Sequence, residues 1–330
     1  MHKYFTRATC CILAVLLLSC QHTPAKFHLE GFAQGTYYNI HYYDMQNRDL
    51  QDNIDSLLDE FDKTASLFVP TSLICKINKN EKDVIVNKDF KAMFDLAMEV
   101  SRQTDGDFDV TVGQLSRAYG FAAEKRIQLT DFELDSIKQC IGYQKVKIVN
   151  MQVIKDIDCL MLDFNAIAQG YVVDKIAAYF DSLQILDYLI DVGGEIIAKG
   201  QKTDGNWKVG IEQPSENQYS ERQMAVAIPL INSALVTSGN YRKYFEKDGK
   251  RFGHTISPKT GQPAQNQLLS ATIKCPKAAL ADAYATACMV MGVQKSKQFL
   301  EQHPQLDAYL IYIENDTLKT FLTKGFKELL

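Results

Sequence analysis

Residues 159–180 read CLMLDFNAIAQGYVVDKIAAYF, and this stretch decides the fold class of the chain. Its first six residues are mostly apolar and run into a turn at Asp163 and Asn165, which predicts a short strand. Apolar positions then recur with helical spacing from residue 166 to residue 180, which predicts a helix directly after the strand. At such a turn the backbone amides and the positive end of the helix dipole face any anion that lies nearby.

The rest of the chain mixes helices and strands in an irregular order. Helical spacing predicts helices over residues 53–68, 90–100, 277–290 and 293–300. Strands are expected over residues 31–43, 84–86, 146–149, 188–192, 207–212, 224–230, 269–274, 307–313 and 318–322, with a hairpin around residues 247–250. Because this order lacks a steady βαβ rhythm, the expected fold class is α+β, with mixed, largely antiparallel sheets and packed helices. The sequence has no internal repeat and no linker that would force a boundary, so residues 31–330 are expected to form one domain.

The composition is that of a globular protein that does not bind nucleic acid. The chain has 330 residues, of which 46% are hydrophobic and 23% are charged. Its formal net charge is -4, and it contains no Lys/Arg run and no zinc-finger spacing. These features exclude the electrostatic footprint of a nucleic-acid-binding protein.

The N-terminus is expected to form a signal peptide over residues 1–19. His2, Lys3 and Arg7 precede an apolar run over residues 10–18, which is too short to span a bilayer. Residues 17–20 read LLSC and resemble the bacterial lipobox, in which Cys20 would carry the lipid. An ordinary signal peptide followed by a coincidental cysteine is the alternative. We therefore expect a lipidated tether over residues 20–30 and an exported protein anchored to a bacterial membrane, facing the periplasm.

Five cysteines follow this N-terminal segment. They are scattered, with no CxxC pair and no histidine at ligand spacing, which argues against a zinc site and against a dense disulfide framework. The sequence does not decide whether two of them form a disulfide. The five are Cys75, Cys140, Cys159, Cys275 and Cys288.

Residues that could carry chemistry cluster in five separated segments. The familiar signatures GxGxxG, GxxxxGK[ST], HExxH and GxSxG are all absent. Glycine, carboxylate and hydroxyl residues gather instead at GDFDVTVG (106–113), DFNAIAQGY (163–171), DVGGE (191–195), TSGNY with GHTISPKTGQP (237–241 and 253–263), and ADAYATA (281–287).

Each segment has a structural interpretation beside a functional one. Asp163 could face a ligand or cap the N-terminus of the helix that follows it. Gly193 and Gly194 could let the backbone approach a ligand closely, or could form a tight turn or bulge. His254, in a glycine-rich loop, could act as a base or could make hydrogen bonds at the surface.

The last segment suggests a cation site. Asp282 and Thr286 stand four residues apart and share one helix face. Their oxygens, with small alanines between them, suit a hard cation that prefers oxygen ligands and retains some waters. The alternative is an aspartate near a helix N-terminus with a threonine in the core.

Taken in order, the motifs GTYY, FDVTVG, DFNAIAQGY, DVGGEI, TSGNY, HTISPKTGQP and ADAYATA resemble those of the FAD:protein FMN transferase family, also called ApbE. The resemblance covers about residues 31–322 and implies an ApbE-like fold, FAD as a substrate and Mg²⁺ as a cofactor. The metal ligands that it implies are the Asp282 carboxylate, the Thr286 hydroxyl and the Ala166 carbonyl, with Ala285 adjoining. The FAD contacts that it implies are Gln34, Phe68, Asn78, Phe108, Asp109, Val110, Asp163, Gln169 and Ile256.

The resemblance also implies a reaction. The FMN half of FAD would pass to a Thr or Ser hydroxyl of an acceptor protein, AMP would be released, and His254 would take the proton of that hydroxyl. Subunits of exported redox complexes are the expected acceptors. Two alternatives stay open: hydrolysis of FAD to FMN and AMP at the same site, and a lipid-anchored protein that binds flavin without catalysis.

Overall fold

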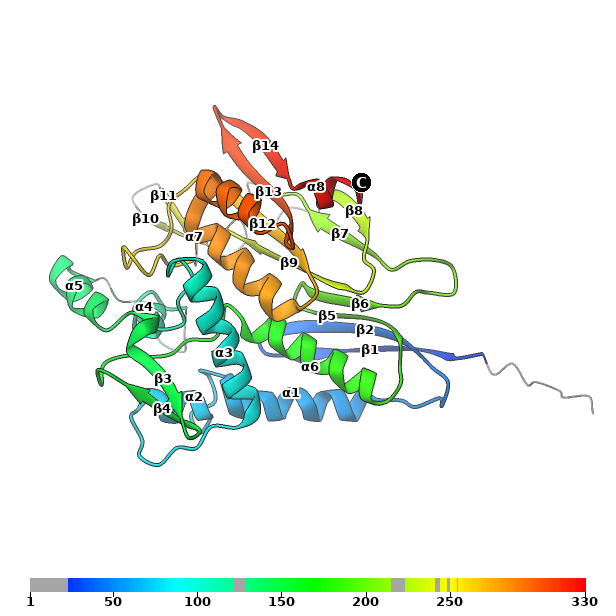
Figure 1. The fold of residues 1–330 in the computed structure, drawn as a ribbon, viewed down its shortest axis with the longest axis horizontal. Helices are drawn as coiled ribbons and strands as arrows, with labels where there is room; N and C mark the ends of the chain where they lie inside the picture. The colour runs from blue at the N-terminus through cyan, green and yellow to red at the C-terminus, as the bar shows by residue number, and fades with distance from the viewer. Residues whose placement is uncertain are drawn as a thin grey trace, which may run out of the picture.

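An eight-stranded antiparallel sheet runs through the molecule in the order β1-β2-β5-β6-β9-β12-β13-β14 (Figure 1). The computed structural model describes residues 23–121, 127, 129–214, 223–240, 244–247, 250–253 and 255–330. The strands of the sheet are β1 (Ala25–Ala33), β2 (Thr36–Asp44), β5 (Asp187–Val192), β6 (Glu195–Lys199), β9 (Ser233–Gly239), β12 (Leu268–Cys275), β13 (Asp307–Glu314) and β14 (Thr317–Leu322).

Helices and three hairpins surround this sheet. The hairpins pair β3 (Val146–Val149) with β4 (Gln152–Lys155), β7 (Lys208–Glu212) with β8 (Met224–Pro229), and β10 (Tyr244–Lys247) with β11 (Lys250–Gly253). The helices are α1 (Gln51–Ala65), α2 (Leu73–Asn78), α3 (Lys88–Gln103), α4 (Gly113–Ala118), α5 (Asp131–Gln139), α6 (Ala168–Ser182), α7 (Ala278–Gln302) and α8 (Lys324–Lys327), with a 3₁₀ turn at Tyr143–Lys145. In the part of the chain that the structure describes, no helix is both long enough and apolar enough to cross a bilayer.

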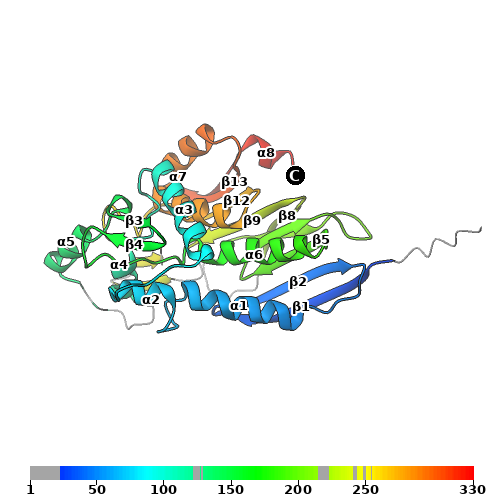
Figure 2. The ribbon, with the colours of Figure 1, turned by 60° about the horizontal axis from the view of Figure 1, so that its bottom comes forward.

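The two faces of the sheet bury different cores, because side chains alternate along each strand. On β2, Ile40 and Tyr42 belong to the larger core, which α1, α3, α6 and α7 cover. The next residue on the same strand, Tyr43, packs with Trp207 in a smaller core under the β7–β8 hairpin. Figures 1 and 2 show the consequence: α6 lies over β5 and β6, and α7 lies over β9 and β12, on one side of the sheet.

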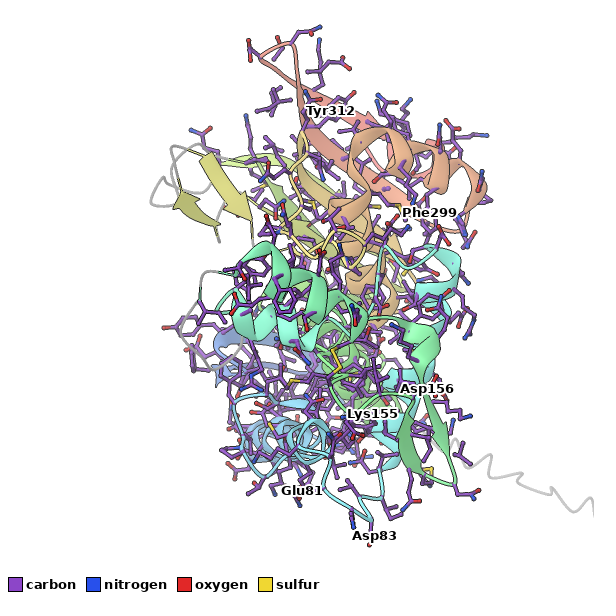
Figure 3. The ribbon with its side chains drawn as sticks, turned by 90° about the vertical axis from the view of Figure 1, so that its left-hand side faces the viewer. Glu81, Asp83, Lys155, Asp156, Phe299 and Tyr312 are labelled. Atoms are coloured by element: carbon purple, nitrogen blue, oxygen red, sulfur yellow. A yellow bond between two sulfur atoms is a disulfide. The ribbon has the colours of Figure 1, made fainter. Side chains whose placement is uncertain are left out.

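The short elements α2, α4, α5 and the β3–β4 hairpin gather at one end of the molecule (Figure 1). Lys155 of β4, labelled in Figure 3, joins two of them. Its ammonium donates to the Ile77 carbonyl oxygen at 2.7 Å and to the Asn80 side-chain oxygen at 2.6 Å. A third, small core of Leu115, Leu134, Ile141 and Ile256 fills the space around α4 and α5. Two of the segments that the sequence singled out reach this end, namely residues 106–113 and the loop with Ile256.

The expected α+β class is confirmed, and three strand predictions are wrong. The strand expected over residues 31–43 is instead two antiparallel strands, β1 and β2, joined by a turn at Gln34 and Gly35. Residues 159–164 form extended chain with one isolated bridge, between Met161 and Val112, and no strand. Their apolar alternation is genuine, because Leu160 and Leu162 are fully buried. Their backbone, however, bonds to the Asn78 side chain and to the backbone of Val110 and Gly113, and not to a strand ladder. Residues 84–86 form no strand either. Among the described residues, β1 begins at Ala25, within the segment expected as a tether.

Candidate functional site

The site is centred where the start of α6 touches the start of α7. A Cβ on Gly170 would lie 2.4 Å from the Ala278 carbonyl oxygen, so only glycine permits this approach of the two helices. Asp174, one turn further along α6, accepts hydrogen bonds from the amides of Ala278 and Ala279 at 2.8 and 3.0 Å. A side chain of α6 thereby caps α7, which fixes the two helix starts against each other.

Asp282 lies inside this contact. Its side chain is almost completely buried, and its Oδ2 accepts a hydrogen bond from the Gly170 amide at 3.2 Å. Burial raises the pKa of this carboxyl from 3.8 to about 7, and the Gly170 amide lowers it only in part. Among the described residues, no lysine or arginine pairs with it. A buried carboxylate without a counter-cation fits a site for a cation.

Thr286 and Ala285 continue the same helix face toward the sheet. The Thr286 hydroxyl lies 3.4 Å from the Ser238 hydroxyl of β9, and Ala285 is fully buried. Ala166 precedes α6 by two residues and is partly buried, so its carbonyl belongs to the turn that leads into the Gly170 contact. The oxygen atoms that could bind a metal here belong to one carboxylate, to hydroxyls and to backbone carbonyls. Mg²⁺ prefers oxygen ligands of these kinds.

A metal site built mainly of ionisable side chains is absent from the described part of the chain. No three His, Cys, Asp or Glu side chains come together there in a way that could hold a metal ion. A site with a single carboxylate, such as that at Asp282, differs from this pattern because hydroxyl and carbonyl oxygens would supply the other ligands.

Asp163 sits at the turn before α6 but does not cap it. The N-cap residue of α6 is Ile167, which makes no side-chain capping bond. The Asp163 carboxylate accepts a hydrogen bond from the Asn165 amide at 2.8 Å and another from the Ser116 side chain. Burial raises its pKa. The capping interpretation of Asp163 is therefore wrong, and the carboxylate instead shapes the turn that carries Ala166.

Asn78 holds the chain that leads to Asp163. Its side-chain amide donates to the Leu162 carbonyl at 2.8 Å, and its side-chain oxygen accepts from the Leu162 amide at 2.7 Å. Both ends of the Asn78 amide are thus engaged with one backbone residue, as in a strand ladder. This pair replaces the ladder that a strand over residues 159–164 would have made.

The segment with Phe108, Asp109 and Val110 lies directly beside this chain. The Asp163 amide donates to the Val110 carbonyl at 2.7 Å, and the Phe108 and Val110 side chains are buried in the core. The Asp109 carboxylate accepts hydrogen bonds from the Thr111 amide, the Thr111 hydroxyl and the Tyr143 amide at 2.7–2.8 Å. Burial raises the Asp109 pKa. These side chains brace the turn, so a ligand would meet this segment at its backbone.

Gln34 and Gln169 come from two other elements. Gln34 occupies the β1–β2 turn with φ of 54°, and its side chain bonds to Asp62 of α1. A Cβ on Gly193 would lie 2.2 Å from the Gln169 side-chain nitrogen, so the glycine turn between β5 and β6 closes directly on α6. Gly193 therefore forms a tight turn that lies against Gln169, and its close approach to a ligand stays a prediction. Phe68, in the loop after α1, is 61% exposed.

A groove of about 1060 Å³ begins at this glycine turn. Its lining includes Thr36 and Gly193 beside Gln169, and it runs between the sheet and the β7–β8 hairpin. Leu235 of β9 lines it and belongs to the smaller core, so the groove lies on the face of the sheet opposite α7.

Ile256 reaches this end of the molecule through its loop. It is buried with Leu115, Leu134 and Ile141, and it pairs with Pro263 in an isolated bridge. His254 lies outside the described residues, so its interpretation as a base stays a prediction. Cys20, the predicted lipidation position, also lies outside them.

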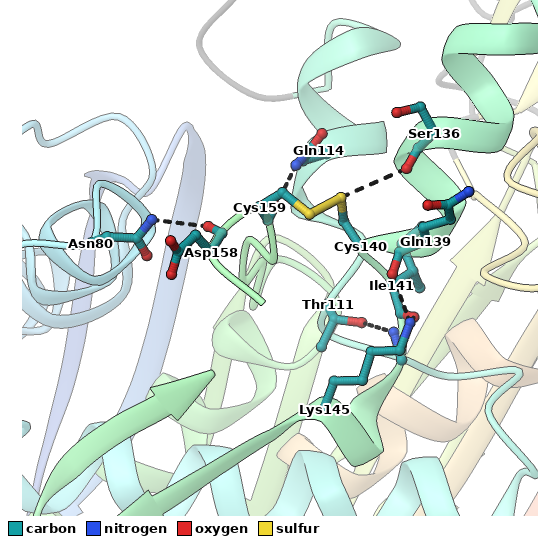
Figure 4. The surroundings of a disulfide bond; sticks show 11 residues. Asn80, Thr111, Gln114, Ser136, Gln139, Cys140, Ile141, Lys145, Asp158 and Cys159 are labelled. Atoms are coloured by element: carbon teal, nitrogen blue, oxygen red, sulfur yellow. Dashed lines mark hydrogen bonds between the residues drawn. A yellow bond between two sulfur atoms is a disulfide. The ribbon is translucent and has the colours of Figure 1, made fainter. Parts of the chain in front are cut away.

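A disulfide between Cys140 and Cys159 ties the loop after α5 to the chain that leads to Asp163 (Figure 4). The two Cα atoms are 5.5 Å apart. Next to it, the Gly142 amide donates to the Thr111 hydroxyl at 2.8 Å (Figure 4). The sequence left this pairing open, because nothing in the spacing of five scattered cysteines selects a pair. Cys75, Cys275 and Cys288 are free thiols.

Comparison with known proteins gives consistent matches over the whole domain. The model of the ApbE family matches residues 34–310. The FAD:protein FMN transferase of Vibrio cholerae is 34% identical over 325 residues, which cover 96% of each chain. The enzyme of that name from Escherichia coli K12 is 30% identical over 350 residues, with 100% of this chain and 99% of the relative covered.

Solved structures agree with these sequence matches. The flavin transferase ApbE of Vibrio cholerae superposes with a TM-score of 0.84 at 32% identity and covers 93% of this chain and 100% of its own. The apo form of the Pseudomonas stutzeri flavinyl transferase ApbE gives a TM-score of 0.82 at 27% identity, covering 93% and 97%.

Proposed function

We propose a reaction for this chain, which belongs to the ApbE family and is an FAD:protein FMN transferase. In this proposal it uses Mg²⁺ to transfer FMN from FAD to a Thr or Ser hydroxyl of an acceptor protein. AMP is the second product of this reaction. The acceptors are subunits of exported redox complexes. Asp282, Thr286 and the Ala166 carbonyl hold the metal, with Ala285 beside them.

The observation that carries the proposal is the burial of Asp282 without a cationic partner among the described residues. An ionised carboxylate in such a place is costly unless a cation accompanies it. Bound there, Mg²⁺ supplies neutralisation of the negative charge on the FAD pyrophosphate. The start of α6 adds the positive end of a helix dipole on the same side, since Gly170 directs its amide at Asp282.

The bond changes are those of a phosphoryl-type substitution. The acceptor hydroxyl oxygen forms a bond to the FMN phosphorus, and the bond from that phosphorus to the bridging oxygen breaks, with its electron pair leaving on AMP. His254 takes the hydroxyl proton in this proposal. Gln34 and Gln169 bind FAD where the β1–β2 turn and the start of α6 meet, and residues 108–110 hold it through their backbone.

A product assay tests this reaction. The purified chain is incubated with FAD and an acceptor protein in MgCl₂ or in EDTA, and AMP is followed by chromatography. We expect AMP release only with MgCl₂ and only when the acceptor keeps its Thr or Ser. Equal AMP release with an acceptor whose Thr is replaced by Val would establish hydrolysis as the activity.

We further propose that the protein is exported and held to a membrane by lipid on Cys20, with residues 1–19 removed as a signal peptide. The disulfide between Cys140 and Cys159 supports this location, because disulfides persist in oxidising compartments outside the cytosol. Among the described residues, the first strand begins at Ala25, shortly after the proposed anchor position in the sequence. Membrane fractionation of cells expressing Cys20→Ala tests the anchor, and retention equal to that of the unchanged protein would contradict it.

A further inference from the structure

One buried carboxylate joins three separate elements at the edge of the candidate site. Asp107 precedes the segment with Phe108 and is almost completely buried. Its Oδ1 lies 2.8 Å from the Lys259 ammonium, and its Oδ2 accepts a hydrogen bond from the Lys295 ammonium. Lys259 belongs to the loop that carries Ile256, and Lys295 belongs to the second half of α7.

These contacts differ from ordinary surface ion pairs. The Asp107 side chain is 7% exposed, whereas the Lys259 and Lys295 side chains are 44% and 47% exposed. Exposed pairs contribute little to stability because water screens both partners. Loss of either lysine would leave the buried carboxylate with one partner fewer, which lowers the stability of the folded chain more than loss of an exposed pair does. We call Asp107, Lys259 and Lys295 the ion cluster.

The loop that carries Lys259 is fixed at its other end by α7 as well. Gly292, with φ of 73°, interrupts α7 between Asp282 and Lys295. One turn before this interruption, the Met289 carbonyl accepts a hydrogen bond from the Asn266 side chain at 2.8 Å. The loop from residue 255 to residue 266 is therefore bound to α7 directly at Asn266 and through Asp107 at Lys259.

We propose that Asp107 is a positioning residue for FAD binding, because the ion cluster holds the 255–263 loop against the segment that contains residues 108–110. The family resemblance implies FAD contacts in both segments, at residues 108–110 and at Ile256, so the inference rests on the proposed function. Without the Asp107 carboxylate, Lys259 would keep only the exposed Asp105 carboxylate, at 3.4 Å, and its ammonium would repel that of Lys295. The part of the loop around Lys259 would then be held less firmly against α7. FAD would then have to order the loop as it binds, which weakens its affinity.

Binding of FAD to the purified chain, measured by quenching of flavin fluorescence, tests the inference. Asp107→Asn keeps the size of the side chain and removes its charge, and Lys259→Met removes one partner. We expect each variant to bind FAD about tenfold or more weakly, and Asp107→Glu to restore part of the affinity. Asp135→Asn is the matched control, because it breaks an exposed pair with Lys138 on α5 and should bind FAD normally.

A double-mutant cycle separates positioning from general damage. If Asp107 acts through Lys259, the combined variant Asp107→Asn with Lys259→Met loses much less affinity than the product of the two single losses. Losses that multiply, or normal FAD binding by Lys259→Met, would overturn the inference. In Lys259→Met the buried Asp107 carboxylate keeps Lys295 as its partner, so this variant should fold even if Asp107→Asn does not.

This measurement is independent of the proposed reaction. The assay contains FAD alone, with no acceptor, and therefore reports binding even if transfer never occurs. Normal transfer together with unchanged FAD binding in the variants would reject the inference and leave the proposed function standing. Weakened FAD binding by the variants of a chain that transfers no FMN would support the inference and reject the proposed function.

Discussion

Replacing Asp282 with Asn in the metal-free protein should increase the free energy of unfolding at pH 8 and leave it nearly unchanged at pH 4. The asparagine side chain is neutral at every pH, whereas burial raises the pKa of Asp282 to about 7 from an unfolded value of 3.8. The folded chain thus binds this proton more tightly than the unfolded chain. The stability that depends on the proton is fully present below pH 3.8, declines as the pH rises, and is lost once the pH passes about 7.

The expected size of the effect follows from the two pKa values. Each unit of difference corresponds to about 1.4 kcal/mol, so the full loss for Asp282 is about 4 kcal/mol as an upper limit. Burial also raises the pKa values of Asp109, Asp163 and Asp174, which lowers the stability of both proteins with rising pH. The difference between the unchanged protein and Asp282→Asn isolates the contribution of Asp282.

Urea unfolding in EDTA, followed by the fluorescence of the buried Trp207, measures both proteins from pH 4 to pH 8. Added MgCl₂ should then stabilise the unchanged protein at pH 8 and should not stabilise Asp282→Asn. Parallel pH curves for the two proteins would refute the electrostatic account of Asp282. Equal stabilisation of both by MgCl₂ would refute its assignment as a metal ligand.

Three further predictions concern catalysis, covalent structure and the choice of acceptor. His254→Ala should slow transfer about a hundredfold or more with FAD affinity little changed, and a collapse of FAD binding would instead make His254 a binding residue. Reduction of the disulfide between Cys140 and Cys159, which are 19 residues apart, should lower the free energy of unfolding by about 3 kcal/mol, and identical urea curves with and without reductant would contradict this. The chain should not modify its own Thr272, which is fully buried in β12 between β9 and β13, and a flavin adduct mapped to Thr272 after long incubation would contradict this.

The sequence predicted the elements whose local pattern and tertiary role agree. The helical spacing of Ile54, Leu58 and Phe61 predicted α1, and all three side chains are buried in the larger core. The predicted break between residues 290 and 293 corresponds to Gly292, where α7 is interrupted. In both cases the signal lies within a few neighbouring residues.

The wrong strand predictions come from local sequence patterns whose backbone partners are set by tertiary contacts. Leu160 and Leu162 alternate as in a strand, yet the side chain of Asn78 and the backbone of Val110 take the place of a neighbouring strand. Residues 237–239, which begin the TSGNY motif, form the last part of the central strand β9. The sequence did not predict this strand.

Contacts between segments that are distant in the sequence could not be predicted either. The motifs indicated Asp282 and Thr286 because both lie on one helix face. The Gly170 contact, the disulfide and the ion cluster join distant segments, so nothing short of the folded chain reveals them.

Intact mass spectrometry of an acceptor protein tests the central claim most directly. The purified chain, FAD and MgCl₂ are incubated with an acceptor that carries a candidate Thr, with a Thr→Val acceptor as the control. The account predicts the addition of one FMN to that Thr, none on the control acceptor, and none in EDTA. An acceptor that stays unmodified while FAD is converted to FMN and AMP would contradict the claim.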